Sequence, residues 1–504
     1  ATIRRIELLP TSMAAYLGIW RYTKTLRIAM IIAHLLLLVL TAASAAAQPL
    51  RPFEAPILAA VDARTERFGQ ISRQIWEHPE TGYQEFKSAA LLRDELKANG
   101  FRITENVAGI PTAFIAEWGS GAPIIGIIGE YDALPGLSQQ DIPQRQARVE
   151  GAPGHGCGHN LFGAASALAA VAVKHHLEST RTPGTIRFYG TPAEEGGGGK
   201  IYMIRANAFQ DASVVLAWHP LDRNEADNNP WLANVSGRFR FTGRSAHAAA
   251  SPDAGRSALD GIEIMTHALN LLREHVPQET RIHYVITKGG DAPNIVPETA
   301  ELSLIARHPD QRQLESIWER VLNTAQAGAL ASGTTMNFEI SSSYTNMVHT
   351  PSLVALLDRN LRATGGVHYS PEERTFAEAL RKRMVDLPED LPLGSEREIQ
   401  PPRRDLVYAS TDVGDVSWVV PTGHFHAATF PPGTPLHTWM STAAAGTSLG
   451  RKGMVVAAKT LALSAAELLH NPQLAAQARQ DWLKSINNRT YKSLLPADRK
   501  PAPR

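Results

Sequence analysis

The sequence predicts an α/β protein, with a mostly parallel-sheet main domain, helices on both faces of that sheet, and an inserted ferredoxin-like α+β domain. First, a chain of 504 residues exceeds the length at which one hydrophobic core usually stops growing, so two domains are expected. Second, short apolar strands alternate with helical stretches in the first half, as in a parallel sheet covered by helices. Third, a β-α-β-β-α-β order follows between residues 232 and 346.

The composition is that of an ordinary globular protein. Hydrophobic residues make up 43% of the chain and charged residues 20%. The formal net charge is +1, and the chain has no long basic run. The sequence therefore gives no reason to expect nucleic acid as a partner.

The N-terminal segment differs from the rest of the chain. Basic residues up to Arg27 precede an apolar run over 28–40, and small residues, mostly alanine, fill 41–47. This order is typical of a secretory signal peptide, which we expect to span residues 1–47. The alternative is a membrane anchor that stays attached, but the apolar run is short for a bilayer. Because no later apolar stretch is long enough to span, we expect a periplasmic or secreted protein without a stable membrane span after processing.

The chain has one cysteine, Cys157. Exported proteins often contain disulfides, yet a single thiol can form none within the chain. Cys157 therefore needs another explanation.

Three predicted strands of the main domain end in acidic or histidine residues. The strand over 124–128 leads to Asp132, the strand over 185–189 to Glu194 and Glu195, and the strand over 213–217 to His219. In open α/β sheets, sites form beyond the carboxyl ends of the strands. This convergence indicates a functional site more strongly than any single residue does.

The remaining elements set the domain boundaries. The expected helical stretches of the main domain are 55–100, 161–175, 351–363 and 454–469, and the charged, proline-rich stretch 371–405 is expected to be a surface excursion. The insert has predicted strands over 238–242, 282–287, 300–306 and 337–341, and helices over 257–273 and 311–329. We therefore assign 48–231 and 347–490 to the main domain, 232–346 to the insert, and 491–504 to a flexible tail.

Several residues have the chemistry of metal ligands. Cys157 and His159 are separated by one glycine, and thiolate and imidazole are favoured zinc ligands; the alternative is a buried thiol beside a hydrogen-bonded histidine. In the adjacent pair Glu194–Glu195, one carboxylate can bind metal while the other acts as a general base; the alternative is a solvated acidic pair. His219 alone could be a core residue, and His437 a surface one.

Taken together, these residues form a soft-to-borderline ligand set. Two metal ions roughly 3.5–4 Å apart that share a water would need about this number of ligands. The set therefore predicts a two-metal site.

The motifs resemble those of the aminoacylase and carboxypeptidase family of co-catalytic metallopeptidases. The matching segments are 130–136, 156–160, 192–196, 218–219 and 436–437. They are most similar to the branch that contains the p-aminobenzoyl-glutamate hydrolase subunits. The resemblance implies that five residues bind two divalent ions, Mn²⁺ or Zn²⁺: Cys157, His159, Glu195, His219 and His437. It also implies that Glu194 is the catalytic base and acid, and that Asp132 lies just behind the metal ligands.

The resemblance further assigns residues of the insert, which would act as a lid and dimerisation domain. His247 would polarise the scissile carbonyl, often in the site of a partner subunit, while Asn294 and Arg307 would hold the substrate carboxylate. Each has a plainer alternative: a cap, a turn residue and a surface strand residue. Asn160 departs from the auxin-conjugate branch, which has an acidic residue there, so metal affinity or identity can differ.

The resemblance implies a metallo-amidohydrolase that cleaves an N-acyl amino acid or a p-aminobenzoyl-glutamate-like amide with a free carboxylate. A homodimer, or a pair with a homologous subunit, is expected. Three alternatives stay open: a periplasmic dipeptidase or carboxypeptidase, a non-catalytic metal-binding relative, and a thiol enzyme that uses Cys157. The thiol enzyme would need an exposed cysteine of low pKa.

Overall fold

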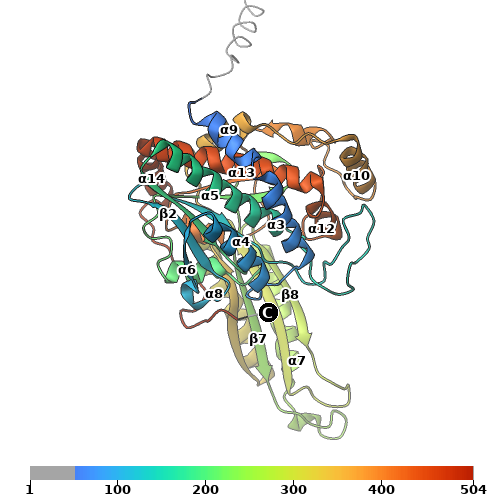
Figure 1. The fold of residues 1–504 in the computed structure, drawn as a ribbon. Helices are drawn as coiled ribbons and strands as arrows, with labels where there is room; N and C mark the ends of the chain where they lie inside the picture. The colour runs from blue at the N-terminus through green and yellow to red at the C-terminus, as the bar shows by residue number, and fades with distance from the viewer. Residues whose placement is uncertain (1–50, 503–504) are drawn as a thin grey trace, which may run out of the picture. The chain divides into compact units, whose positions relative to one another are not determined.

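The computed structural model describes residues 51–502, so the expected signal peptide over 1–47 lies outside the described residues. The chain divides into two compact units, Ala1–Ala55 and Pro56–Arg504. Of the first unit only 51–55 are described, and they begin helix α2 (Glu54–Asp62). The second unit holds both predicted domains (Figure 1).

The main sheet has eight strands among the described residues, in the order β1-β2-β4-β3-β5-β12-β6-β11. The four central strands, β4, β3, β5 and β12, are parallel. Strands β1 and β2 extend the sheet antiparallel at one side, and β6 is antiparallel to β12 at the other. The sheet is therefore mixed, and the predicted parallel arrangement holds in its centre. The bounds are β1 (Arg102–Glu105), β2 (Phe114–Ser120), β3 (Ile124–Gly129), β4 (Gly184–Gly190), β5 (Val214–Leu221), β6 (Asn224–Ala226), β11 (Ile399–Gln400) and β12 (Thr422–Ala428).

The chain leaves β3 toward β4 on one side of it, and then returns past β3 to β5 on the other side. Helix α5 (His159–Thr180) connects β3 to β4 on one side, and α6 (Gly199–Arg205) lies on the connection from β4 to β5 on the other. Because such crossovers are right-handed, α5 and α6 lie on opposite faces of the sheet. The carboxyl end of β3 is thus a topological switch point, the place where α/β sheets bind ligands.

Helix α13 (Ser448–His470) packs against α5 and the central strands, and α9 (Pro351–Thr364) lies beside it (Figure 1). Contrary to the expectation from the sequence, α13 could cross a membrane by length and composition, but 78% of its apolar window is buried inside the protein. Helix α13 is therefore a helix of the protein core. The other helices of this domain are α3 (Thr65–Glu77), α4 (Phe86–Ala98), α10 (Pro371–Arg381), α11 (Val413–Ser417), α12 (Trp439–Ala445) and α14 (Pro472–Ile486).

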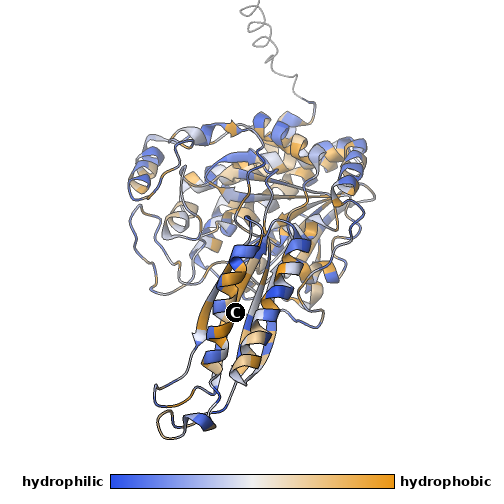
Figure 2. Cartoon of the chain, turned by 180° about the vertical axis from the view of Figure 1, so that it is seen from behind, coloured by the Kyte–Doolittle hydropathy of each residue, from blue (hydrophilic) through white to orange (hydrophobic). Residues whose placement is uncertain are grey.

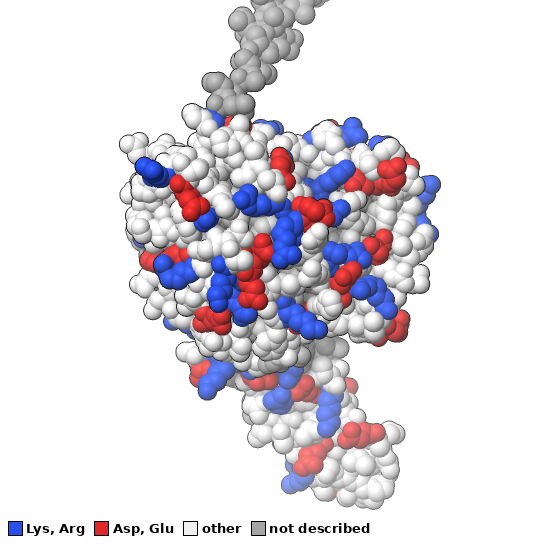
Figure 3. Space-filling model, in the orientation of Figure 1, with Lys and Arg blue, Asp and Glu red and all other residues white. Residues whose placement is uncertain are grey.

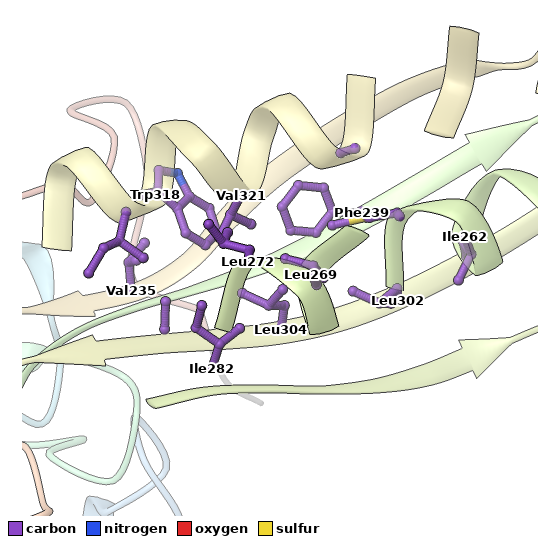
Figure 4. Close-up of a cluster of buried hydrophobic side chains, with 14 of the residues drawn as sticks. Val235, Phe239, Ile262, Leu269, Leu272, Ile282, Leu302, Leu304, Trp318 and Val321 are labelled. Atoms are coloured by element: carbon purple, nitrogen blue, oxygen red, sulfur yellow. The ribbon is translucent and has the colours of Figure 1, made fainter. Parts of the chain in front are cut away.

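The insert forms a four-stranded antiparallel sheet of order β10-β7-β9-β8, the order of a ferredoxin-like unit. Its elements are β7 (Ala233–Thr242), α7 (Ala258–Leu272), β8 (Arg281–Lys288), β9 (Thr299–His308), α8 (Gln311–Ser332) and β10 (Thr335–Tyr344). Both helices carry hydrophobic as well as hydrophilic residues (Figure 2), and the buried ones recur at helical spacing. Their apolar sides, with Leu269 and Trp318, cover Phe239 and Leu302 of the sheet (Figure 4). The other face of the sheet is left for polar residues.

Three features of the structure add to what the sequence predicted. The excursion over 371–405 contains α10 and also β11, which pairs with β6. Strand β12 lies in the centre of the sheet and was not predicted from the sequence. The expected flexible tail is anchored at two positions: Tyr491 donates a hydrogen bond of 2.8 Å to Asp415, and Leu495 is buried. On the face shown in Figure 3, Lys and Arg are interspersed with Asp and Glu, as the net charge near zero leads one to expect.

Candidate metal centre

The first group of candidate ligands lies at the switch point. The Sγ atom of Cys157 is 3.3 Å from Nε2 of His219, and one ligand atom from each of Cys157, His159 and His219 lies within 4.8 Å of the other two. Nδ1 of His219 is 2.8 Å from the carbonyl oxygen of Pro220 and donates to it, because a carbonyl can only accept. This bond fixes the ring and leaves the lone pair of Nε2 directed toward Cys157.

A second group shares the same thiol. Ligand atoms of Cys157, Glu195 and His437 also lie within 4.8 Å of one another, and Nε2 of His437 is 3.4 Å from Oε1 of Glu195. Cys157 therefore stands between two sets of donors. Neighbouring sites with a common ligand are the arrangement expected for two metal ions that share a water.

The loops need special backbone geometry to place these ligands. Gly158 has φ of 81° at the start of α5, and a Cβ there would come within 2.8 Å of Pro220. His437 itself has φ of 58°, and its backbone N–H donates a 3.0 Å hydrogen bond to Gly156. The ligand segments around 157, 219 and 437 thus hold one another in place.

The donor set fits metal cations. The buried Oε1 of Glu195 accepts no hydrogen bond from any residue of 51–502, although His437 lies close by. Buried polar atoms without a partner are rare, and two ligand atoms that face each other across a short gap match a cation between them. Burial, and then the charge of Glu195, raise the pKa of the Cys157 thiol well above its ordinary value. This environment opposes a nucleophilic thiolate in the absence of a cation and disfavours the thiol-enzyme alternative.

Glu194 lies beside the ligands with a different character. Burial, followed by the charges of Glu130 and Glu195, raises its pKa well above the ordinary value of a carboxyl. The loop that carries it is held from both sides: Oε1 of Glu85 accepts a 2.9 Å bond from the N–H of Ala193, and the hydroxyl of Tyr344 donates a 2.8 Å bond to the carbonyl of Glu194. A buried carboxyl with a raised pKa binds a proton more readily than an exposed one, which suits a group that accepts a proton and returns it.

Asp132, which the resemblance places just behind the metal ligands, contacts both His159 and the backbone of Glu195. Its Oδ1 is 2.9 Å from Nδ1 of His159, and its Oδ2 accepts a 2.9 Å bond from the backbone N–H of Glu195. A carboxylate in this position orients a histidine ligand and raises its basicity.

Three residues near this centre were not predicted as site residues. Lys200 is fully buried, and its Nζ lies 2.7 Å from Glu130 and 2.6 Å from Asp412. Glu130 in turn lies 3.2 Å from Nε2 of His159. The sequence offered two weak signals: Glu130 belongs to a quoted motif, and Lys200 follows four glycines. The ion pair of Lys200 with Asp412 joins parts of the chain that are far apart in the sequence, so no local sequence pattern predicts it.

The structure divides the predicted lid residues between the two ends of the insert. Arg307 is near the metal centre and donates a 3.1 Å bond to Ser410. His247 and Asn294 lie beyond the opposite ends of β7 and β9, next to each other, with Ala248 donating to the carbonyl of Asn294. Strands of this length separate their ends by roughly 30 Å. Within a single chain, Asn294 and Arg307 are therefore too far apart to hold one carboxylate together.

Two cavities meet at the candidate ligands. One, of about 750 Å³, is lined by Arg281, His283 and Arg307 of the insert and by Glu194, Glu195 and His437. The other, of about 360 Å³, lies within the main domain and shares these last three residues. A substrate at the metal centre could therefore extend in two directions.

The fold and the site together define a metal-dependent hydrolase. Residues 233–331 match the peptidase dimerisation domain of the M20 peptidases. A subunit of the p-aminobenzoyl-glutamate hydrolase of Escherichia coli is 38% identical over 469 residues, which cover 88% of this chain and 98% of that protein. The Xaa-Arg dipeptidase of Mus musculus is 32% identical, over 84% of this chain and 90% of that protein.

The chain belongs to the M20 family of peptidases and amidohydrolases, and is a metal-dependent enzyme that hydrolyses amide bonds. Among solved structures, a dinuclear metal-binding M20 peptidase from Bacillus subtilis has the same fold, with a TM-score of 0.56 and 18% identity, over 81% of this chain and 99% of that one. The family binds two metal ions, in agreement with the two ligand groups around Cys157.

Proposed function

We propose that this enzyme hydrolyses the amide bond of an N-acyl amino acid whose amino acid part keeps a free carboxylate, as in p-aminobenzoyl-glutamate. The observation that carries the proposal is the cationic cavity beside the metal centre. Two guanidinium groups, Arg281 and Arg307, line it, while its only acidic lining residues among those described are Glu194 and Glu195 at the centre itself. A carboxylate bound there would place the neighbouring amide near the metal ligands.

The arrangement of the two arginines favours the binding of an anion. Arg281 and Arg307 are directly opposite each other in the β8–β9 ladder, where like charges destabilise a sheet. Neither forms an ion pair with a carboxylate of residues 51–502. Burial lowers the pKa of Arg307, because its guanidinium has lost water without gaining a carboxylate partner. Two guanidinium groups without a carboxylate partner suit an amino acid with two carboxylates, and the paired geometry of guanidinium and carboxylate provides specificity.

The catalytic residues have separate tasks. Bound metal ions would supply Lewis acidity and lower the pKa of a water at the site. Glu194 would take a proton from that water and later deliver it to the leaving nitrogen, because its buried carboxyl holds a proton more readily than an exposed one. Arg307 would orient the carboxylate of the substrate. Asp132 would keep His159 and Glu195 aligned.

We assign the polarisation of the scissile carbonyl to His247 of a second copy of the chain, or of a homologous subunit. Within one chain, His247 lies at the end of β7 remote from Arg307, and its Nδ1 accepts bonds from the N–H groups of Ala249 and Ala250. Its exposed position at the tip of a dimerisation domain is suited to reach another subunit. Asn294, beside it, would enter the same second site.

The finer features of the centre are also proposals. Either Mn²⁺ or Zn²⁺ suits a set of one thiolate, three imidazoles and a carboxylate. A periplasmic or secreted location would follow from the basic and apolar order of residues 21–47.

A dipeptidase is the second candidate function, supported by the 32% identity to an Xaa-Arg dipeptidase. The cationic cavity argues against arginine as the leaving residue here, since Arg281 and Arg307 would repel it. A non-catalytic relative would have no use for the buried Glu194.

A substrate panel tests the proposal. The purified protein of known metal content should be given N-acyl-glutamate, N-acyl-alanine, N-acyl-arginine and dipeptides with a free α-amino group. We expect the highest kcat/KM for N-acyl-glutamate and the lowest for N-acyl-arginine. A preference for dipeptides would establish the second candidate, and two bound metals without hydrolysis of any amide would contradict both.

A further inference from the structure

The loop that carries Glu194 rests on a segment from a distant part of the sequence. This segment, 82–85, comes directly before helix α4, whereas the loop follows strand β4. The hydroxyl of Tyr83 donates a 2.7 Å hydrogen bond to the carbonyl of Gly197 in the loop. A displacement of the segment 82–85 would therefore move the loop as well.

Two residues at this contact have a backbone conformation that residues other than glycine rarely adopt. Tyr83 has φ of 65°, and Ala193, the residue before Glu194, has φ of 56°. Such conformations persist only where the surrounding contacts hold them, and they are concentrated at functional sites. The position of Glu194 therefore depends on the contacts that hold Ala193.

The side chain of Glu85 holds both of these residues. Its Oε1 accepts a 2.8 Å bond from the N–H of Tyr83 and a 2.9 Å bond from the N–H of Ala193. Its Oε2 lies 2.9 Å from the hydroxyl of Thr112, which can donate to it or accept from it. One oxygen of the carboxyl group thus bonds the two residues of positive φ, while the other oxygen fixes the group itself.

Glu85 does not have the role that its place in the chain would ordinarily give it. It is the N-cap residue of α4, where a polar side chain usually accepts a bond from the first turn, yet it makes no such bond. Burial, and then the charge of Asp132, raise the pKa of Glu85 to about 8, so the carboxyl is mostly protonated at neutral pH. Because the hydroxyl of Thr112 can accept from it, protonation preserves all three bonds.

The loop has a separate contact for each of its two carboxylates. Asp132 accepts a bond from the N–H of Glu195, the candidate metal ligand, whereas Glu85 accepts one from the N–H of Ala193, next to Glu194. The loss of one contact leaves the other in place. Removal of the Glu85 side chain should therefore disturb Glu194 more than the metal ligand.

We infer that Glu85 is a positioning residue, which holds Ala193 in its strained conformation and thereby keeps Glu194 directed toward the reacting centre. The inference rests on the proposed role of Glu194 as base and acid, and it names the residue that keeps Glu194 in place. A displacement of about 1 Å in a reacting group can lower a rate by about 100-fold. Variants that lose the bond to Ala193 should therefore lose turnover and keep the metal ions.

The test compares variants of Glu85 in the whole, metal-loaded protein, with N-acyl-glutamate as substrate. Glu85→Ala removes all three bonds and should lower kcat about 10- to 100-fold, with KM nearly unchanged and about two metal ions still bound. Glu85→Asp should act in the same direction, because its side chain is one methylene too short to reach Ala193, although aspartate is a favoured N-cap residue and supports α4. Glu85→Gln, which can form the same three bonds, should keep most of the wild-type kcat.

Glu373→Ala is the matched control. Glu373 is also a buried carboxyl, on helix α10, and accepts bonds from Ser448 and Lys452. This variant should keep the wild-type kcat. Hydrogen exchange of the segment 190–200, followed by mass spectrometry, gives a second readout that does not depend on activity. Exchange there should be faster in Glu85→Ala than in the wild type, and unchanged in the control.

Several outcomes would overturn the inference. They are full kcat in Glu85→Ala, a fall in kcat that matches a loss of bound metal, and a Glu85→Gln protein as slow as Glu85→Ala. If Glu85→Ala does not fold, equal kcat in Glu85→Asp and Glu85→Gln would overturn it.

The exchange measurement separates this inference from the proposed function. If Glu194→Gln protein is fully active, the proposed role of Glu194 fails, yet faster exchange of 190–200 in Glu85→Ala would still support Glu85 as the residue that holds the loop. Unchanged exchange would refute the inference, whatever the role of Glu194.

Discussion

Nδ1 of His159 lies 2.9 Å from Oδ1 of Asp132, and the second oxygen of the same carboxylate accepts a bond from the N–H of Glu195. One side chain therefore aligns a candidate ligand of each metal group. Asp132→Asn keeps the shape but removes the charge, so we expect metal affinity to fall about 10- to 100-fold. A chelator competition titration measures this, with the exposed Asp141→Asn as control. Unchanged affinity would mean that Asp132 does not support the ligands.

The buried ion pairs of Lys200 predict a stability effect. Removing a charge that satisfies Glu130 and Asp412 leaves two carboxylates buried without their cation. Lys200→Met should lower the free energy of unfolding by about 3–5 kcal/mol. Urea unfolding of this variant is compared with that of Lys97→Met, which alters an exposed lysine on α4. A loss below about 1 kcal/mol in both would show that these pairs contribute little.

Arg281 predicts a selective effect on substrate binding. If it holds the side-chain carboxylate of the substrate, Arg281→Gln should raise KM for N-acyl-glutamate about 10-fold, because a hydrogen bond to a charged group contributes about 1.5–3 kcal/mol. The KM for N-acyl-alanine should stay the same. Steady-state kinetics on the two substrates gives the answer, and Arg312→Gln on the exposed side of α8 controls for charge. A parallel rise for both substrates would be inconsistent with a side-chain contact.

Asp415 predicts a pH dependence of stability. Burial raises its pKa to about 7 from an ordinary value of 3.8. A carboxyl with a raised pKa stabilises the folded state fully below pH 3.8, and this contribution is lost as the pH rises through 7. Relative to Asp415→Asn, the wild type should therefore gain about 2–3 kcal/mol between pH 7.5 and pH 5. Urea unfolding at both pH values measures it, with the exposed Asp498→Asn as control, and an unchanged difference would contradict the raised pKa.

The sequence predicted the candidate ligands at strand ends because periodicity locates β3, β4 and β5, and parallel strands bring their carboxyl ends together. Strand β12 was not predicted from the sequence, and the reason is physical. All of its residues are buried, including His424 and His426, so it shows neither an apolar run nor an alternating pattern.

Side-chain contacts between residues that are far apart in the sequence could not be predicted either. Lys200 and Asp412 are 212 residues apart, and neither lies in a pattern that marks the other. The spacing of Asn294 and Arg307 along the sequence does not show that the length of strand β9 separates them. The prediction of His437 as a metal ligand depended mainly on the family resemblance, because a histidine in a loop with positive φ has no distinctive sequence pattern.

Glu194→Gln tests the central claim most directly, because Glu194 lies beside the ligands without belonging to either group around Cys157. Metal content and hydrolysis of N-acyl-glutamate should be measured on the same preparations of wild type and variant. We predict about two metal ions per chain in both proteins and a loss of at least about 100-fold in kcat in the variant alone. Full activity of Glu194→Gln would contradict the account, as would an active wild type that binds no metal.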